Sequence, residues 1–255
     1  MSERVAVGVV GPADAAVERA VREAGGDPTP GAAADVTDTG FVVAVGEPAL
    51  LAVARASPDV PVLPVAAGRG VRSVPRDAVE PALAALLAGE YTREAHPILD
   101  ARVGDRTAVR ALTDVMLASA EPAQISEYTV RAGGERVARF RADGVVLATP
   151  AGSTGYARTA GGPVVPPEAD VLTVVPVSPF STDVDHWVLP LGDVTVSVER
   201  DETDIHLVAD DRVVGLVDRS EPAEISSTDT LTVAVVESSR SCFERAKAGT
   251  PGHAR

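Results

Sequence analysis

Apolar runs and helical stretches alternate along the first third of the chain. Short apolar runs, typical of buried strands, lie at 4–10, 41–45 and 61–65. Stretches that predict helices follow them, at 14–23, 49–56 and 77–87. Strands that alternate with helices at this spacing predict a parallel sheet covered by helices. We therefore expect an α/β domain over residues 1–90.

The pattern changes after residue 91, where short segments rich in β-branched residues follow one another. They lie at 101–103, 108–117, 127–131, 136–140, 145–148, 171–175, 193–198, 205–208, 213–217 and 230–236. Gly133-Gly134 separates two of them and predicts a hairpin turn. Repeated short strands of this kind predict a β-rich, β-sandwich-like domain over residues 91–237. The polar tail, 238–255, contains one helical stretch at 243–247.

Composition excludes several classes of protein. Hydrophobic residues make up 45% of the chain and aromatic residues only 3%, so we expect an aliphatic core. Every apolar run is too short to span a membrane. Cys242 is the single cysteine, which excludes an intrachain disulfide framework and a cysteine-rich zinc site. The start, Met1-Ser2-Glu3-Arg4, does not resemble a signal peptide, and we expect a cytoplasmic protein.

The charge balance is strongly acidic. The chain carries 37 acidic and 23 basic residues, a net charge of −14, and Lys247 is its single lysine. An acidic surface almost free of lysine suits a halophile, in which high salt screens self-repulsion; an acidic protein from a GC-rich mesophile is the alternative. Because duplex nucleic-acid binding depends on cationic neutralisation of phosphates, we expect no nucleic-acid partner.

One stretch, residues 143–163, carries the candidate chemistry. An apolar strand runs into Thr149-Pro-Ala-Gly-Ser-Thr-Gly-Tyr156 and then into Ala160-Gly-Gly-Pro163. A turn of small and hydroxylated residues lets backbone N–H groups approach an anion, and Tyr156 offers a ring face or a hydroxyl to a nucleotide. No Gly-Lys-Ser or Gly-Lys-Thr occurs, which excludes a P-loop.

The same turn also fits a loosened nucleophile elbow. Ser153 lies between Gly152 and Gly155 in Ala151-Gly-Ser-Thr-Gly155, and His186 and His206 follow it in the sequence. A serine hydrolase needs a histidine base and an acid behind the serine. Four histidines in an acidic chain satisfy that order by chance, so this alternative depends on the geometry around Ser153.

The motif resembles the signature of the NAD kinase family, Thr-Pro-Thr-Gly-Ser-Thr-Ala-Tyr followed by Ala-Gly-Gly-Pro. Two of the eight core positions differ, at Ala151 and Gly155. The resemblance extends to residues 42–51, where the family has a strand leading into Gly-Gly-Asp-Gly-Thr, and to 66–74, a degenerate form of the next glycine loop. It also extends to Ala111-Leu112-Thr113-Asp114, in place of Ala-Leu-Asn-Glu, and to 208–211, which resembles a late Asp-Gly turn.

The resemblance implies an α/β domain, a β-sandwich-like domain and a nucleotide site between them. The implied reaction transfers a phosphoryl group from ATP, with Mg²⁺, or from polyphosphate to the 2′-hydroxyl of the adenosine ribose of NAD. The implied ligands are NAD(H), NADP(H) and ATP, without a membrane partner, and the implied assembly is a homodimer or homotetramer. The chain end is expected to return to the first domain, with Phe243 as a candidate anchor.

The resemblance also implies the site residues. Glu47 takes the place of the family's catalytic Asp. The dinucleotide-binding positions correspond to Thr113, Asp114, Thr154, Gly155, Tyr156 and Thr159. The phosphate loops correspond to Gly46, Gly152 and Ser153, and no protein metal site is implied. Asp210 and Asp211 read as surface turn acids.

The departures from the family pattern are concentrated around Glu47. Glu47 keeps the charge but moves the carboxylate by roughly 1 Å, a misplacement that can cost about a hundredfold in rate. Pro48 removes an N–H donor, Ala49 lacks the threonine hydroxyl, and Val45 adds a side chain near the expected acceptor. Pro179 stands where a histidine is expected, and His186 reads as a surface or packing residue.

These departures leave three functions open. The first is a divergent NAD kinase that uses Glu47. The second is a relative that binds NAD(P) or adenine nucleotides as a sensor and has lost phosphoryl transfer. The third is a kinase of the wider superfamily with another acceptor, of which the lipid kinases are disfavoured because no basic amphipathic stretch is present.

Overall fold

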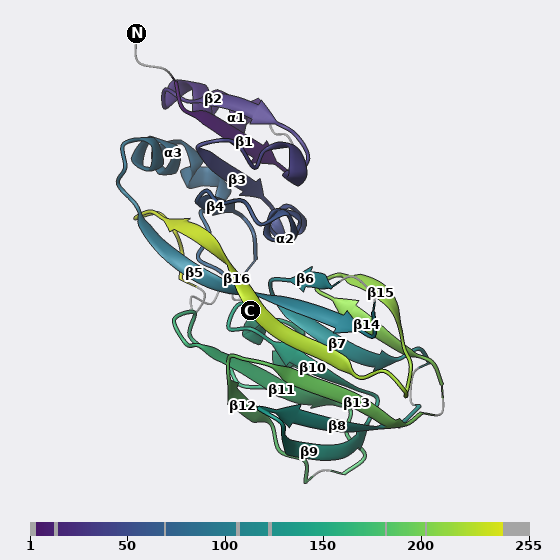
Figure 1. Ribbon diagram of the computed structural model, residues 1–255. Helices are drawn as coiled ribbons and strands as arrows, with labels where there is room; N and C mark the ends of the chain where they lie inside the picture. Colours follow the sequence, from purple (N-terminus) through teal and green to yellow (C-terminus); the bar gives the residue numbers. More distant parts are fainter. Residues whose placement is uncertain are drawn as a thin grey trace, which may run out of the picture.

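The first part of the chain folds as alternating strands and helices, as the sequence pattern predicts (Figure 1). The computed structural model describes residues 4–241 with the exception of 13, 14, 69, 106, 107, 122, 123, 182 and 202. The first elements are β1 (Ala6–Val10), α1 (Ala15–Glu23), β2 (Asp27–Pro30), β3 (Phe41–Val45), α2 (Glu47–Ala56), β4 (Val62–Val65) and α3 (Val79–Leu87). Short 3₁₀ turns lie at η1 (Ala33–Asp35) and η2 (Arg76–Ala78).

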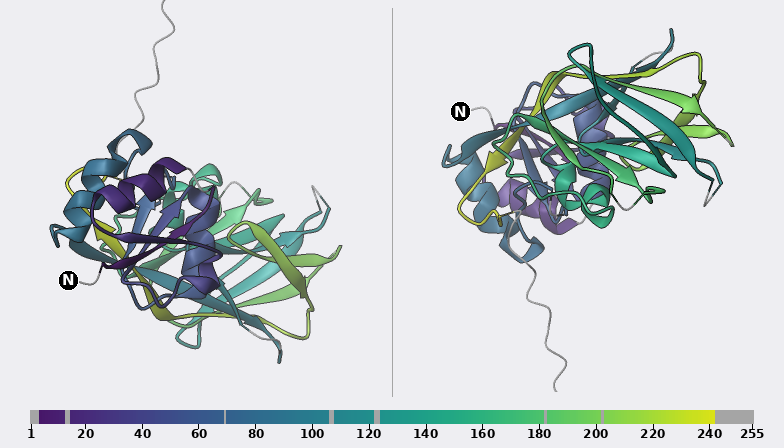
Figure 2. Two further views of the ribbon diagram at one scale, coloured as in Figure 1. Left: turned by 90° about the horizontal axis from the view of Figure 1, so that it is seen from above. Right: turned by 90° about the horizontal axis from the view of Figure 1, so that it is seen from below.

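Strands β1 to β4 form a parallel sheet in the order β2-β1-β3-β4, with helices on both faces (Figure 2). Successive side chains of a strand point to opposite faces. Val43 and Val45 of β3 therefore pack with α1 and α3, whereas Val42 and Ala44 pack with α2. Burial on both faces explains why β3 reads as one continuous apolar run.

Strand β2 was not expected from the sequence. Its residues, Asp27-Pro28-Thr29-Pro30, combine two prolines with an aspartate, and these residues are depleted in strands. β2 pairs only with β1 at the edge of the sheet, where proline is tolerated because one side of the strand makes no ladder.

The second part of the chain forms strands around two short helical turns. The strands are β5 (Thr92–Val103), β6 (Val109–Ala111), β7 (Asp114–Ser119), β8 (Ser126–Ala132), β9 (Glu135–Ala142), β10 (Gly144–Ala148), β11 (Val171–Val177), β12 (Trp187–Pro190), β13 (Val194–Arg200), β14 (Ile205–Ala209), β15 (Arg212–Val217) and β16 (Ala223–Val235). The turns η3 (Gly152–Thr154) and α4 (Tyr156–Thr159) follow β10. Gly133 and Gly134 both have positive φ and make the predicted hairpin turn between β8 and β9.

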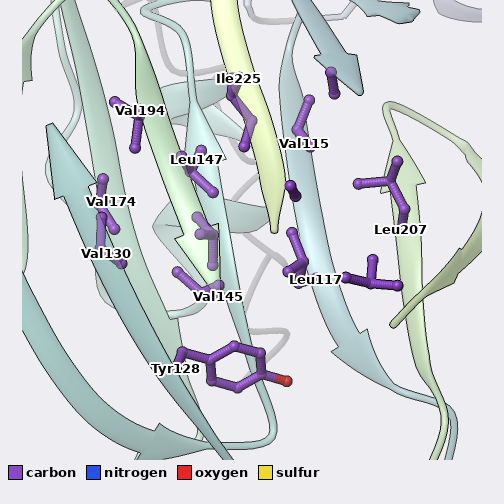
Figure 3. Packing of buried hydrophobic residues seen from close by; sticks show 14 of the residues in the cluster. Val115, Leu117, Tyr128, Val130, Val145, Leu147, Val174, Val194, Leu207 and Ile225 are labelled. Atoms are coloured by element: carbon purple, nitrogen blue, oxygen red, sulfur yellow. The ribbon is translucent and has the colours of Figure 1, made fainter. Parts of the chain in front are cut away.

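Two sheets enclose the larger core. One contains six strands in the order β12-β11-β10-β7-β14-β15, and the other includes β5, β16, β13, β8 and β9. Buried residues of both sheets, among them Leu117, Tyr128, Leu147 and Ile225, belong to one cluster (Figure 3). The chain therefore has the expected fold class, a parallel α/β part followed by a β-sandwich-like part.

Strand β16 joins the two parts. It pairs antiparallel with β5 and β13 and parallel with β4 at Val233 and Val62, so that one ten-stranded sheet runs through the molecule (Figure 1). The sequence pattern predicted only 230–236 of this strand. The segment 223–229 is rich in polar residues and lacked the apolar signal. Because the sheet is continuous, the domain limits at residues 90 and 237 stay a prediction.

The described part of the tail returns to the first part of the chain. Arg240 N donates to Ser73 O at 3.0 Å, and the two residues form an isolated antiparallel bridge. The helical stretch expected at 243–247, and Phe243 as its anchor, lie outside the described residues. In the part of the chain that the structure describes, no helix is long and apolar enough to cross a membrane.

Candidate functional site

A cavity of about 520 Å³ lies where the two parts of the chain meet. The first part contributes the start of α2 and the loop after β4, and the second part contributes three segments near the ends of β6, β10 and β14. The lining consists of Glu47, Pro48, Leu50, Leu51, Ala67, Gly68, Gly70, Val71, Leu112, Thr113, Asp114, Ala151, Gly152, Thr154, Gly155, Tyr156, Asp210 and Asp211. The sequence motif and Glu47, more than a hundred positions apart in the chain, thus share one cavity.

Glu47 is the first residue of α2 and lines the cavity. Gly46 precedes the helix with φ 87°, a left-handed conformation that favours glycine, and it sets the turn without lining the cavity. The carboxylate lies against the loop after β4, because a Cβ on Gly68 would be 3.1 Å from Glu47 Oε2. Glu47 therefore faces the cavity, as a catalytic carboxylate requires.

Pro48 and Val45, which depart from the family pattern beside Glu47, do not keep the Glu47 carboxylate from the cavity. Pro48 lies in the first turn of α2, where backbone N–H groups have no partner within the helix and proline is tolerated. Val45 is fully buried on the face of the sheet that carries α1 and α3, and it does not line the cavity. Pro48 therefore does not direct Glu47 away from the cavity, and Val45 does not fill the cavity.

The loop between β4 and α3 is closed by its own hydrogen bonds. Ala66 N donates to Val74 O at 2.9 Å, and Ser73 Oγ accepts from Ala67 N at 3.0 Å. A Cβ on Gly70 would overlap the backbone of Ala151, so a glycine is required for this loop to approach the motif turn. The described residues of the degenerate segment 66–74 therefore still contribute a wall of the cavity.

Arg72 fixes this wall to strand β5. Its Nε donates to Glu94 Oε2 at 2.9 Å, and Glu94 Oε1 lies 2.8 Å from Nε2 of the fully buried His96. The contact with His96 holds the pKa of Glu94 below its ordinary value. Arg72 lowers this pKa further, whereas burial of the carboxylate acts in the opposite direction. The carboxylate of Glu94 is thus stabilised in the folded protein.

We expect Glu94→Gln to lower the free energy of unfolding by about 1–3 kcal/mol at pH 7, the usual contribution of hydrogen bonds to a charged group. A lowered folded pKa gives stability that is present above the unfolded value and lost as pH falls through the folded value. Urea unfolding of both proteins should give a constant difference between pH 7 and 5 and a smaller one below about pH 4. The exposed Glu90→Gln is the control; a difference that grows on acidification contradicts the assignment.

Leu112 and Thr113 interrupt what the sequence predicted as one strand over 108–117. Their N–H groups donate to the side chain of Asp210, at 3.2 Å to Oδ2 and 2.8 Å to Oδ1. The hydroxyl of Thr149 donates to Leu112 O at 2.7 Å, and Thr149 N donates to Thr113 O at 2.9 Å. Asp210 and Thr149 therefore provide the hydrogen bonds that a neighbouring strand would otherwise make with Leu112 and Thr113. The strand is interrupted here, and β6 ends before β7 begins.

Thr113 and Asp114 both line the cavity, but their side chains differ in role. The hydroxyl of Thr113 donates to Asp210 Oδ1 at 2.7 Å, so its proton is not free for a ligand. Asp114 is partly exposed at the start of β7. The pKa of Asp114 is raised to about 7, mainly by burial and in addition by the nearby Asp210 carboxylate, whereas the neighbouring Thr113 hydroxyl acts in the opposite direction.

The raised pKa of Asp114 predicts a stability effect with a definite sign. Because the folded pKa of about 7 exceeds the ordinary value of 3.8, the stability of the wild type falls as pH rises through 7. Asp114→Asn is expected to gain stability over the wild type between pH 5 and 8, reaching on the order of 2–4 kcal/mol. Thermal unfolding across this range measures the gain, with exposed Asp38→Asn as control; an equal offset at pH 5 and 8 contradicts it.

The motif turn places its residues in two layers. Gly152, Thr154, Gly155 and Tyr156 line the cavity, and Tyr156 is 46% exposed, which excludes a role as a buried packing residue. Ser153 is fully buried beneath them. Thr159 lies at the end of α4, where its hydroxyl donates to Gly155 O at 3.4 Å, and it does not line the cavity.

The geometry around Ser153 does not support a serine hydrolase. Its hydroxyl donates to Pro150 O at 2.7 Å and accepts from Val165 N at 3.0 Å, which commits it to holding the turn. His186 is exposed and lies near Gly161 instead, and His206 is part of β14. Ser153 therefore supports the phosphate-loop backbone and does not reach the cavity.

The expectation that Asp210 is a surface turn acid is wrong. Its side chain is fully buried and holds Leu112 and Thr113, whereas the side chain of Asp211 is 50% exposed at the cavity. The sequence offered only the resemblance of 208–211 to an Asp-Gly turn as a signal for either residue. Pro48, Leu50, Leu51, Ala67, Val71 and Ala151 also line the cavity and were not predicted.

The described residues do not form a metal site of their own. No group of three or more His, Cys, Asp or Glu side chains among them is arranged to hold a metal ion. Mg²⁺ usually binds through one or two carboxylates together with substrate phosphates and water. Glu47, an exposed carboxylate at the cavity, fits that kind of shared ligation.

A family model matches the second half of the chain. Residues 112–241, just over half of the chain, match the family model for the ATP-NAD kinase C-terminal domain. The NAD kinase of Gemmatimonas aurantiaca is 35% identical over 150 residues, 56% of this chain and 52% of that protein. The NAD kinase of Methanosarcina mazei is 34% identical over 137 residues, 53% and 47% of the two chains. The matched region thus spans about half the length of these curated relatives.

Solved structures resemble the fold over nearly the whole chain. Yeast NADH kinase complexed with NADH superposes with a TM-score of 0.78 at 16% identity, covering 93% of this chain and 85% of that chain. An NAD kinase from Archaeoglobus fulgidus in complex with ATP superposes with a TM-score of 0.75 at 24% identity, covering 91% and 93%. At these identities the likeness establishes the fold, and the family match rests on residues 112–241. The chain belongs to the ATP-NAD kinase family.

Proposed function

We propose that this protein transfers a phosphoryl group from ATP or polyphosphate to the 2′-hydroxyl of the adenosine ribose of NAD, forming NADP. One observation carries the proposal: the motif residues Thr154 to Tyr156 and the carboxylate of Glu47 line the same cavity. The yeast relative was solved with NADH and the Archaeoglobus fulgidus relative with ATP, which are the ligand classes that this reaction needs.

Each wall of the cavity has a part in this proposal. Tyr156 and Asp114 hold the dinucleotide, through an exposed ring and a carboxyl group that accepts hydrogen bonds when ionised. Backbone N–H groups of the glycine-rich turns approach the phosphates. Glu47 orients the acceptor hydroxyl and takes its proton as the phosphoryl group is transferred.

Mg²⁺ fits this site when it is bound together with the phosphates of the phosphoryl donor. Glu47 would share the ion with donor phosphates, and Asp211 offers a further exposed carboxylate at the cavity. When bound, the ion neutralises charge on the phosphates. Its presence also compensates for the lining, whose described residues include four carboxylates, Glu47, Asp114, Asp210 and Asp211, and no lysine or arginine.

The altered loop around Glu47 supports a second function, the binding of NAD(P) or adenine nucleotides without phosphoryl transfer. Pro48 strengthens this alternative, because it lacks one N–H donor at the start of α2. The relatives, in contrast, are named as kinases, and Glu47 faces the cavity with its carboxylate. We therefore favour the kinase.

The test is formation of NADP from NAD, Mg²⁺ and either ATP or polyphosphate, detected with an NADP-specific dehydrogenase. The assay belongs in molar KCl, since we propose that the net charge of −14 reflects adaptation to high salt in the cytoplasm. We also propose a homo-oligomer, which light scattering under the same conditions tests. If the protein binds NAD but forms no NADP from either donor, the kinase function is contradicted and the second function, nucleotide binding without phosphoryl transfer, is supported.

A further inference from the structure

Asp210 has an unusual backbone conformation and an unusual environment for a turn residue. It lies between β14 and β15 with φ 52°, in the left-handed region that Asp tolerates better than most side chains. Its side chain has no exposed surface. A buried carboxylate needs hydrogen-bond partners to be retained in a folded protein.

Among the described residues, the hydrogen-bond partners of the Asp210 side chain all belong to one segment of the cavity wall. Its carboxylate accepts from the N–H groups of Leu112 and Thr113 and, at 2.7 Å, from the hydroxyl of Thr113. Its own N–H donates to Asp114 O at 2.9 Å. Asp210 thus holds three consecutive residues, and two of them carry side chains expected to meet the dinucleotide.

A cation from the other side of the cavity faces the same carboxylate. Arg55, near the end of α2, places Nη1 3.8 Å from Asp210 Oδ2 and 3.4 Å from Asp211 Oδ1. Helix α2 begins at Glu47. Asp210 therefore contacts both the wall that carries Asp114 and the helix that carries Glu47.

We propose that Asp210 is a positioning residue, which sets Thr113 and Asp114 for dinucleotide binding and ties them to helix α2 through Arg55. The inference rests on the proposed function, in which Asp114 contacts the dinucleotide. The carboxylate of Asp210 stays buried within the wall, and the residue acts through the segment that it holds.

The charge of Asp210 provides a readout that a purely structural role would not move. Its carboxylate contributes to the raised pKa of Asp114, after burial. The charged groups that face this pair are Arg55 from α2, Asp211 from the same turn and Glu47 across the cavity. Asp210→Asn removes the like charge and keeps the shape, so the pH dependence of NAD binding should shift to lower pH.

The experiment compares Asp210→Asn and Asp210→Ala with the wild type in NAD binding, kcat and KM between pH 5 and 8. We expect NAD affinity to fall about 10- to 100-fold in both variants, KM to rise with it and kcat to change by less than about threefold. The inflection near neutral pH should move down in Asp210→Asn. The control is Asp218→Asn, an exposed turn aspartate bonded to Ser220, which should stay within about twofold of the wild type.

Amide hydrogen exchange separates this inference from the proposed function. Leu112 and Thr113 amides should exchange at least about tenfold faster in Asp210→Ala than in the wild type, whether or not the protein makes NADP. Failure of the wild type to bind NAD, with this acceleration observed, overturns the proposed function and leaves Asp210 as the residue that holds the wall. Unchanged exchange, or NAD affinity within twofold of the wild type with an unmoved pH inflection, overturns the inference.

Discussion

Glu47→Gln is expected to reduce NADP formation by about 10²–10⁴-fold, the usual contribution of a general base. The amide keeps the size of the side chain and cannot take the proton of the acceptor hydroxyl. NAD affinity should stay within about twofold, because the proposed dinucleotide contacts come from Asp114 and the motif turn on the opposite wall. Initial rates and equilibrium binding measured on one preparation check both halves of the prediction.

The matched control is Glu80→Gln. Glu80 is exposed in the first turn of α3, as Glu47 is in the first turn of α2, and it lies outside the cavity. Its substitution should leave the rate unchanged. Equal activity in Glu47→Gln and the wild type would remove Glu47 as the catalytic carboxylate and leave the function to be assigned to another group.

Gly152→Ala is expected to cause the largest loss of stability. A Cβ at this position would overlap the carbonyl group and Cα of Thr113, which are backbone atoms and cannot turn aside. The two segments are also joined, since Thr149 N and Oγ1 donate to Thr113 O and Thr149 Oγ1 accepts from Gly152 N at 3.2 Å. Overpacking of this kind costs about 1–3 kcal/mol or more, and the constrained backbone places this site at the upper end.

Urea unfolding measures that loss, and NAD binding should weaken with it because both walls of the cavity shift. Gly192→Ala is the control, since no atom lies within 4 Å of a Cβ there. A free energy of unfolding for Gly152→Ala within about 0.5 kcal/mol of the wild type would show that the two walls are not packed as closely as described.

The hydrophobic pattern predicted the elements whose side chains are buried. Strand β3 and the strands around Leu117 and Leu147 read clearly because their apolar residues face a core. The pattern missed β2, residues 92–100 of β5, β12 and the first half of β16. These segments are polar or contain proline, and the long strands β5 and β16 owe their structure to each other across more than a hundred residues.

The candidate site was predictable in part, through the motif and not through the pattern. The resemblance indicated Glu47, Asp114 and Tyr156, which the fold brings to one cavity. It could not reveal that Asp210 is buried, because that depends on a side chain reaching back across the break at Leu112 and Thr113. Gly46, Ser153 and Thr159, which the resemblance also indicated, lie outside the lining.

The central claim is that the dinucleotide binds in the cavity between helix α2 and the turn after β10. Hydrogen exchange of the wild type with and without saturating NAD tests it most directly. The account predicts slower exchange at 112–114, 151–156 and 210–211, with no change around the separate 480 Å³ cavity that includes Asp193 and Glu224. Protection confined to that second cavity, or none at 151–156, would contradict it.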